Sequence, residues 1–251
     1  MKDFKWVKEC RDGIYYFLIG QSTFFRKRGL WKYAWLSLFL MFLVYVSIWV
    51  AGTVYLLPWL TALLQGISHT AAGKILLCFS KPLFWGAFLL LIWTTQSILY
   101  QCFGSFIFDE LSDYYEKTAY GYTCCVSPQQ KRKAGTDSFL LSCKNACLSM
   151  GLLLLSLVSF GWAVIICMPL IGYMLGISYF QACAVNHGIR VKTLLPAANK
   201  HFLTISVFGV CSALVQSFPF SAFLLTPGFI IGGCHFFWDK LVPELNMKNN
   251  N

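Results

Sequence analysis

Charged side chains are scarce in this sequence: Asp, Glu, Lys and Arg together make up 12% of its 251 residues, whereas 57% of the residues are apolar. The longest uncharged stretch, residues 145–186, contains no Asp, Glu, Lys, Arg or His at all. A chain with so little polar material cannot cover the surface of a soluble globule. The composition therefore indicates a polytopic membrane protein with the lipid bilayer as its first partner.

Motifs for catalysis and metal binding are also missing. The sequence has no H-x-x-x-H or C-x-x-C pattern, and its four histidines are isolated from one another. An isolated His near a membrane interface is more often a structural hydrogen-bonding residue than a ligand or a general base. We therefore expect no catalytic residue, no metal site and no cofactor, and we expect that the protein is not an enzyme.

The eleven cysteines are an odd number, and most are scattered through apolar segments, where we interpret them as small buried residues. The adjacent Cys124 and Cys125 are open to two interpretations. They could bind a soft metal or carry a lipid, but reduced thiols in a cytoplasmic loop are favoured, because no further ligands are spaced to converge on them.

Four uncharged apolar runs dominate the chain, at residues 33–57, 82–108, 145–186 and 202–238, the last with one His. The first two have the length of single spanning helices. The third would measure about 63 Å as one helix, about twice the thickness of the hydrocarbon core. We predict that the last two runs are helical hairpins broken by Pro and Gly, with turn residues Pro169, Pro219, Pro227 and Gly232. The expected fold class is an all-α membrane protein with two long transmembrane helices and these two hairpins.

The basic residues predict the orientation. Eight Lys or Arg precede the first run, two lie between the first two runs, and five follow the second. The positive-inside rule then places both termini and residues 109–144 and 187–201 in the cytoplasm. Both hairpins must begin and end on that side. The second is too short for two full crossings and a turn, so we expect arms that penetrate only part way. Backbone turns at that depth need protein neighbours, which predicts a homo-oligomer.

These boundaries describe one integral membrane domain. It has a basic amphipathic cytoplasmic segment at residues 1–32, with apolar positions such as Phe4, Val7 and Ile14 recurring at helical spacing. The remaining parts are the spans 33–57 and 82–108, the cytoplasmic segment 109–144, the hairpins 145–186 and 202–238, and the polar tail 239–251. The formal charge of +10 is explained by topology and an anionic lipid surface, and we expect no nucleic-acid partner.

Two charged clusters are candidate functional sites. The first, which we call the basic turn, lies just before the first run and consists of Arg26, Lys27, Arg28, Gly29, Leu30 and Lys32. A helix start with nearby cations is suited to bind an anion, although ordinary topogenic charges are the simpler alternative. The second follows the second run and consists of Asp109, Glu110, Asp113 and Glu116. These carboxylates are interpreted as a solvated helix start capped by Asp109, or as ion-pair partners of the basic turn.

The absence of charge inside the apolar runs also bears on mechanism. None of the four runs contains Asp, Glu, Lys or Arg. Proton- or ion-coupled pumps usually keep such groups at mid-membrane as relays. Any transport is therefore expected to be passive.

The order of these landmarks resembles a known family. A Gly-containing basic turn precedes the first span, F-D-E-L-S-D-Y-Y-E covers residues 108–116, His187 and Gly188 follow the first hairpin, and Pro219 and Pro227 precede glycines in the second. Over residues 12–240 the chain is similar to the CysZ family of bacterial sulfate permeases and its eukaryotic relatives, the etoposide-induced 2.4 proteins. The resemblance implies two spanning helices, two hemi-penetrating hairpins, an oligomer in the inner membrane, and passage of sulfate.

The resemblance also assigns individual positions. Gly29 and Leu30 match the family's anion-binding Gly-Leu-Arg turn, where Trp31 stands in place of the arginine, and Gln181 stands in place of an aspartate after the first hairpin. Two hypotheses follow. The first is a passive permease or channel for an inorganic anion, with sulfate implied. The second is a membrane scaffold or assembly protein that shares the fold without transporting.

Overall fold

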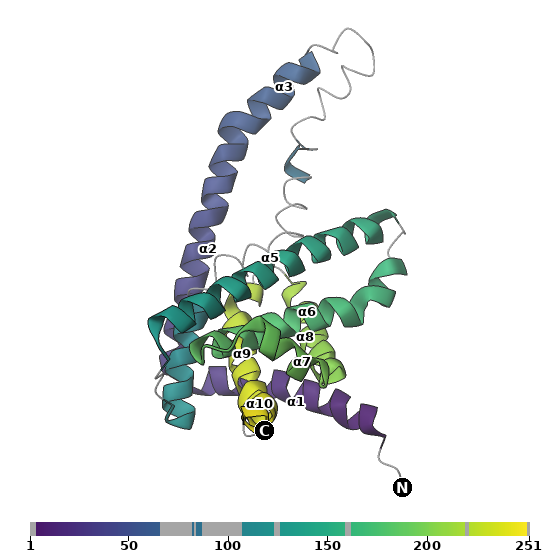
Figure 1. Ribbon diagram of the computed structural model, residues 1–251. Helices are drawn as coiled ribbons and strands as arrows, with labels where there is room; N and C mark the ends of the chain where they lie inside the picture. The colour runs from purple at the N-terminus through teal and green to yellow at the C-terminus, as the bar shows by residue number, and fades with distance from the viewer. Residues whose placement is uncertain are drawn as a thin grey trace.

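The computed structural model describes residues 4–65, 82, 84–86, 107–122, 126–158, 162–218 and 221–249, and every regular element among them is helical (Figure 1). The N-terminal half contains α1 (Lys5–Arg26), the short 3-10 turn η1 (Arg28–Leu30), α2 (Trp31–Ala51), the π-helical turn η2 (Gly52–Leu56), α3 (Leu57–Gln65) and an unlabelled helix over residues 107–120. The C-terminal half contains α5 (Pro128–Val158), α6 (Trp162–Asn186), α7 (Val191–Asn199), α8 (Phe202–Gln216), α9 (Ser221–Phe236), the π-helical turn η3 (Phe237–Leu241) and α10 (Val242–Asn249).

The first predicted span is longer than its apolar run. A helical stretch runs over Arg28–Leu63 and has the length and hydropathy of a membrane span. Pro58 directly follows the apolar run and lies in the first turn of α3, where the missing N–H of a proline is tolerated. The amide of Leu57 donates to the Gly52 carbonyl, five residues earlier, so the helix widens into a π-helical turn just before the proline. In Figure 1 α2 and α3 form an arm that projects from the remaining helices.

The last two apolar runs contain two successive pairs of helices. α5 and α6 lie side by side, and α8 is followed by α9 (Figure 1). α5 begins at Pro128, well before the apolar run, so the basic residues Lys131, Arg132 and Lys133 belong to its first turns. The Cys167–Asn186 part of α6 is long and apolar enough to cross a membrane, and α7 and α8 meet at 97°. The predicted span 82–108 lies almost entirely outside the described residues.

Two of the three prolines predicted at turns, Pro169 and Pro227, lie inside helices. Pro169 lies inside α6, and Pro227 and Gly232 lie inside α9, whereas the first chain reversal falls between Val158 and Trp162. Helices tolerate an internal proline when neighbouring groups satisfy the backbone around it. Near Pro227, Gln21 of α1 donates to the carbonyl of Leu225 at 2.9 Å. Pro219 falls between α8 and α9 but outside the described residues.

Small residues bring the helix backbones into contact. Gly172 and Gly176 are one helical turn apart on α6, and Gly209 of α8 lies against both of them: a Cβ on Gly209 would stand 1.8 Å from the Gly172 carbonyl oxygen. Gly20 of α1 is similarly pressed against the backbone of Gly228 and Gly232 in α9. Such close approach of small residues is how helices pack in membranes, where burial of apolar surface gives little advantage over lipid.

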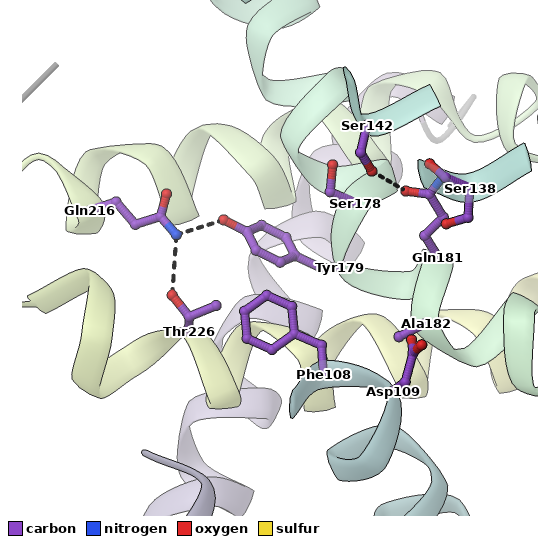
Figure 2. Close-up of a pocket in the computed structure, with 10 residues that line it drawn as sticks. All are labelled: Phe108, Asp109, Ser138, Ser142, Ser178, Tyr179, Gln181, Ala182, Gln216 and Thr226. Carbon is purple, nitrogen blue, oxygen red and sulfur yellow. Dashed lines mark hydrogen bonds between the residues drawn. The ribbon is translucent and has the colours of Figure 1, made fainter. Parts of the chain in front are cut away.

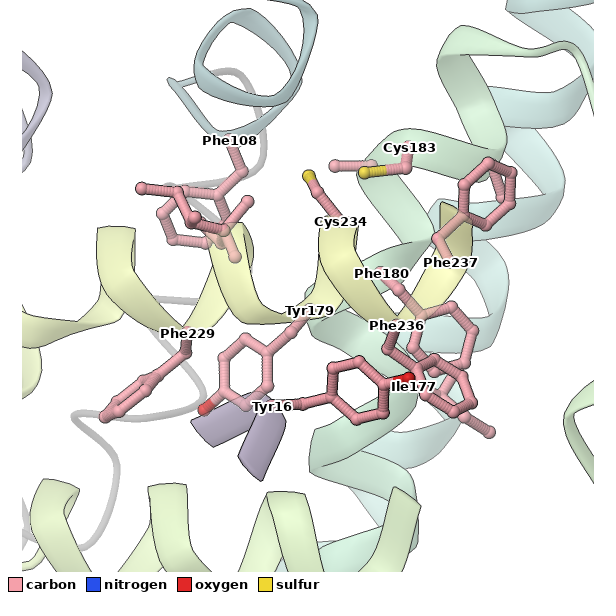
Figure 3. Close-up of a cluster of buried hydrophobic side chains, with 14 of the residues drawn as sticks. Tyr16, Phe108, Ile177, Tyr179, Phe180, Cys183, Phe229, Cys234, Phe236 and Phe237 are labelled. Carbon is pink, nitrogen blue, oxygen red and sulfur yellow. The ribbon is translucent and has the colours of Figure 1, made fainter. Parts of the chain in front are cut away.

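The interior is centred on α6 and α9. Figure 3 shows aromatic side chains of these helices filling the space between them, with Tyr16 of α1 alongside. Phe180, Phe229 and Phe237 are fully buried, and Cys183 and Cys234 face each other with no exposed surface. The expectation of buried cysteines holds for these two, whereas Cys147 is exposed and the other described cysteines are partly buried. α1 buries the face that carries Gly13, Tyr16, Gly20 and Phe24, and its predicted apolar stripe (Phe4, Val7, Ile14, Leu18) remains exposed.

Candidate functional site

A cavity lined by polar side chains lies at the junction of α5, α6, α8, α9 and the helix over residues 107–120 (Figure 2). It offers about 50 Å³ of space to water, enough for at least one molecule. Its lining contains seven neutral side chains with hydroxyl or amide groups: Ser138, Ser142, Ser178, Tyr179, Gln181, Gln216 and Thr226. Phe108, Asp109 and Ala182 complete it.

The lining groups form two hydrogen-bonded sets on opposite sides of the cavity (Figure 2). On one side Gln216 Nε2 donates to the Tyr179 hydroxyl at 2.8 Å and to the Thr226 hydroxyl at 3.3 Å. On the other side the Ser142 hydroxyl donates to Gln181 Oε1 at 3.3 Å, and Gln181 Nε2 donates to the Ser138 carbonyl at 3.1 Å. The second set joins α5 to α6, whereas Gln216 of α8 bonds both to Thr226 of α9 and to Tyr179 of α6. The Gln216–Tyr179 bond therefore links the two hairpins at the cavity.

Asp109 supplies the one carboxylate of this cavity. Its helix is already formed at residue 107, so Asp109 lies inside the helix and does not cap it as predicted. Burial raises the pKa of Asp109 to about 6, and the nearby Lys131 lowers it only in part. The charge of the cavity therefore changes between neutral and mildly acidic pH.

The other acidic residues have separate partners. Asp113 pairs with Lys117 on its own helix at 2.6 Å, and Glu110 is exposed. Glu116 is only 1% exposed and accepts hydrogen bonds from Trp238 Nε1 at 2.9 Å and from His187 Nε2 at 3.0 Å. It is thus a buried link between its helix, the end of α6 and η3, and it is not part of a solvated helix start. No salt bridge among the described residues joins these carboxylates to the basic turn.

The basic turn contacts the same helix through aromatic rings. Lys27 Nζ lies 5.1 Å from the centre of the Tyr115 ring, and Lys32 Nζ lies 5.0 Å from that of Tyr114. Arg26, Lys27, Arg28, Gly29 and Lys32 are exposed, whereas Leu30 is buried. In η1 the amides of Leu30 and Trp31 donate to the carbonyls of Lys27 and Arg28. The structure thus brings the basic turn to the helix whose first turn lines the cavity, through cation–π contacts and not through ion pairs.

His187 is a residue whose role the sequence pattern did not reveal. Its ring stacks on Tyr122 with the centres 4.1 Å apart and points its Nε2 at Glu116. Gly188, which follows it, has a φ of +66°, and the amides of Gly188 and Ile189 donate to the carbonyls of Val185 and Ala184. This is a Schellman motif, and it ends α6 so that His187 faces inward. The H-G dipeptide was the only signal in the sequence, and its partner lies 71 residues away.

No curated protein and no solved structure gives a significant match. A family model described as sulfate transporter CysZ/etoposide-induced protein 2.4 matches residues 16–227, which include the basic turn, all residues that line the cavity, the first hairpin and the second hairpin as far as Pro227. Because that match covers most of its length, the chain belongs to the sulfate transporter CysZ/etoposide-induced protein 2.4 family.

Proposed function

We propose that this protein is a passive permease or channel for a sulfate-type inorganic anion, acting as a homo-oligomer in the bacterial inner membrane. The family relates it to sulfate transport. The polar cavity between the hairpins is the observation that carries the proposal, because seven neutral hydroxyl and amide side chains surround one small space inside the protein. Neutral O–H and N–H groups can replace part of the hydration of an anion and still release it, whereas buried cations would hold it.

The basic turn supplies the complementary feature. Its four exposed cations, Arg26, Lys27, Arg28 and Lys32, raise the local concentration of anions by long-range attraction. It packs on Tyr114 and Tyr115, and the first turn of that same helix lines the cavity. In this proposal the turn attracts the anion and the cavity passes it on.

The helix lengths support the proposed topology. α8 and α9 contain 15 and 16 residues, which is shorter than the roughly 20 residues needed to cross the hydrocarbon core. They fit a hairpin that enters the membrane part way, with the termini, residues 109–144 and residues 187–201 in the cytoplasm. In Figure 1 the start of α1 and the end of α10 lie at the end of the molecule opposite the tip of the α2–α3 arm.

Uptake of labelled sulfate into liposomes tests the proposal. We expect the purified protein to take up sulfate faster than empty liposomes, and the variant in which Arg26, Lys27, Arg28 and Lys32 are all changed to Ala to lose most of that uptake. A matched variant removes the same charge elsewhere by changing the exposed Lys5, Lys8, Arg11 and Lys144 to Ala. Equal losses in both variants would contradict the assignment of the anion site to the basic turn.

The alternative is a non-transporting membrane scaffold or assembly protein with the same fold. It is favoured by Trp31 and Gln181, which stand where the family resemblance places an arginine and an aspartate. It is also favoured by the exposed apolar side chains of the α2–α3 arm. Only 6% of the residues in the most apolar part of this arm are buried inside the protein. A well-folded protein that takes up no sulfate but retains a stable protein partner in mild detergent would decide for the scaffold.

A further inference from the structure

A second cavity, of about 370 Å³, opens at the surface where the first turns of α5 face the segment after α6. It shares no lining residue with the polar cavity. Three cations line it, Arg132, Lys133 and Arg190, together with Gln129, Thr136 and a single carboxylate, Asp137. The lining therefore carries a net charge of +2, and neither Arg132 nor Lys133 forms a salt bridge with another residue that the structure describes.

The position of Arg190 is determined by a backbone turn before it and by an ion pair of its side chain. Gly188, in its left-handed conformation, ends α6 and turns the chain back toward α5. The Arg190 guanidinium then donates to the Asp137 carboxylate, from Nε at 2.8 Å and from Nη2 at 3.4 Å. Arg190 holds the pKa of Asp137 below its usual range, so this pair is charged at neutral pH. The pair uses one edge of the guanidinium, and a guanidinium has further N–H donors.

An exposed apolar surface begins directly after the basic lining. Phe139 and Leu140 follow Arg132 and Lys133 by seven residues, which is two helical turns, so each pair lies on the same face of α5. Their side chains are 55% and 61% exposed. One face of α5 thus changes from cationic to apolar along its length.

We propose that the Arg132–Lys133–Arg190 cavity binds the phosphate group of an anionic phospholipid, with an acyl chain lying over Phe139 and Leu140. Arginine and lysine donors around an open cavity match the oxygens of a phosphate diester. Arg190 is 53% exposed, and salt screens exposed charges, so a free anion gains little there. An acyl chain adds apolar contact that a free anion lacks.

Binding of fluorescent phosphatidylglycerol to the full-length protein in neutral detergent tests this site. We expect saturable binding, and about tenfold or more weaker binding to the double variant Arg132→Gln, Lys133→Gln. Phosphatidylcholine with the same acyl chains should bind weakly, and millimolar inorganic phosphate should not displace the labelled lipid. Glutamine is a good helix former at these exposed positions, so the double variant should fold. A second variant, Phe139→Ser with Leu140→Ser, should also bind the lipid more weakly.

The matched control is Lys8→Ala with Lys144→Ala, which removes the same charge from exposed positions away from the cavity lining. If this control loses as much lipid binding as the Arg132/Lys133 variant, the lipid is held by general charge attraction, and the proposal is overturned. Displacement of the lipid by inorganic phosphate would identify a free-anion site and would also overturn it. The sulfate-uptake assay is independent of both outcomes.

Discussion

Asp109 shows how one residue changes its role with its surroundings. In the sequence it belongs to an acidic run that is typical of a solvated helix start. In the structure it lines the polar cavity between the hairpins, and burial raises its pKa to about 6. Glu116, seven residues later, is buried against His187 and Trp238. Two acidic residues of the same helix therefore have different roles: Asp109 is a titratable group of the cavity, and Glu116 is a structural group.

The pKa of Asp109 predicts a pH dependence of anion uptake. Above pH 6 the cavity contains a carboxylate that repels anions, and below pH 6 the group is protonated and neutral. We expect uptake to rise several-fold as the pH falls from 7.5 to 5. Asp109→Asn should show high uptake with little pH dependence across this range. Initial rates in liposomes at a series of pH values measure this.

The control for this prediction is Asp113→Asn. Asp113 pairs with Lys117 and does not line the cavity, so its replacement should keep the wild-type pH profile. A wild-type profile in Asp109→Asn would show that another group titrates.

At the scale of elements, backbone contact between α6 and α8 determines how closely the two hairpins pack against each other. Gly209 touches the α6 backbone at Gly172 and Gly176. Only glycine at these positions lets the helices approach so closely, and this approach brings Gln216 of α8 within reach of Tyr179 of α6 on one side of the polar cavity. The packing of two helices thus determines where the cavity groups meet.

Gly209→Ala should separate the two helices. Its Cβ would lie 1.8 Å from the Gly172 carbonyl oxygen, and that oxygen belongs to the backbone and cannot turn away. We expect a loss of about 3 kcal/mol or more in the free energy of unfolding, at the upper end of overpacking effects. Thermal unfolding in detergent, followed by the loss of the main size-exclusion peak, measures the change.

Gly151→Ala in α5 is the matched control, because nothing lies within 4 Å of a Cβ there. Alanine favours helix over glycine by about 0.5–1 kcal/mol, so this variant should be as stable as the wild type or more stable. Equal destabilisation by both variants would contradict the role of the Gly172–Gly209 contact.

At the scale of the whole molecule, the α2–α3 arm stands apart from the other helices (Figure 1). Trp35, Phe39 and Phe42 on it are each about 60% exposed. A single helix so little covered must contact lipid or another subunit. The proposed oligomer would cover part of this arm, and it would also supply protein neighbours for the turns of the hairpins.

Light scattering in mild detergent, corrected for bound detergent, tests the oligomer. We expect a protein mass that is a multiple of the 28.5 kDa chain. Changing Trp35, Phe39 and Phe42 to Ala should reduce that mass, because the substitutions remove the large side chains available for contact between subunits. The same substitutions at the exposed Phe4, Trp6 and Val7 of α1 provide a control that should keep the oligomer. A monomeric wild-type protein would contradict the proposal.

The sequence by itself predicted an all-helical protein, and every regular element among the described residues is helical. The two membrane hairpins stay a prediction from the lengths of the apolar runs. Long apolar runs with almost no charge can satisfy their backbone only as helices, and runs much longer than a bilayer must reverse. These are local properties of composition and length, so they can be derived without knowing any contact. The family resemblance, based on landmarks in the same order, is confirmed by the family match.

Only the tertiary structure decided the positions of the turns and the partners of the polar residues. Pro169 and Pro227 were expected to lie at turns, but they lie inside α6 and α9. The partners of Glu116, Gln216 and Arg190 come from other helices, and no spacing in the sequence specifies them. Contacts of this kind depend on how glycines let helix backbones approach, which is a property of packed surfaces and not of any single segment.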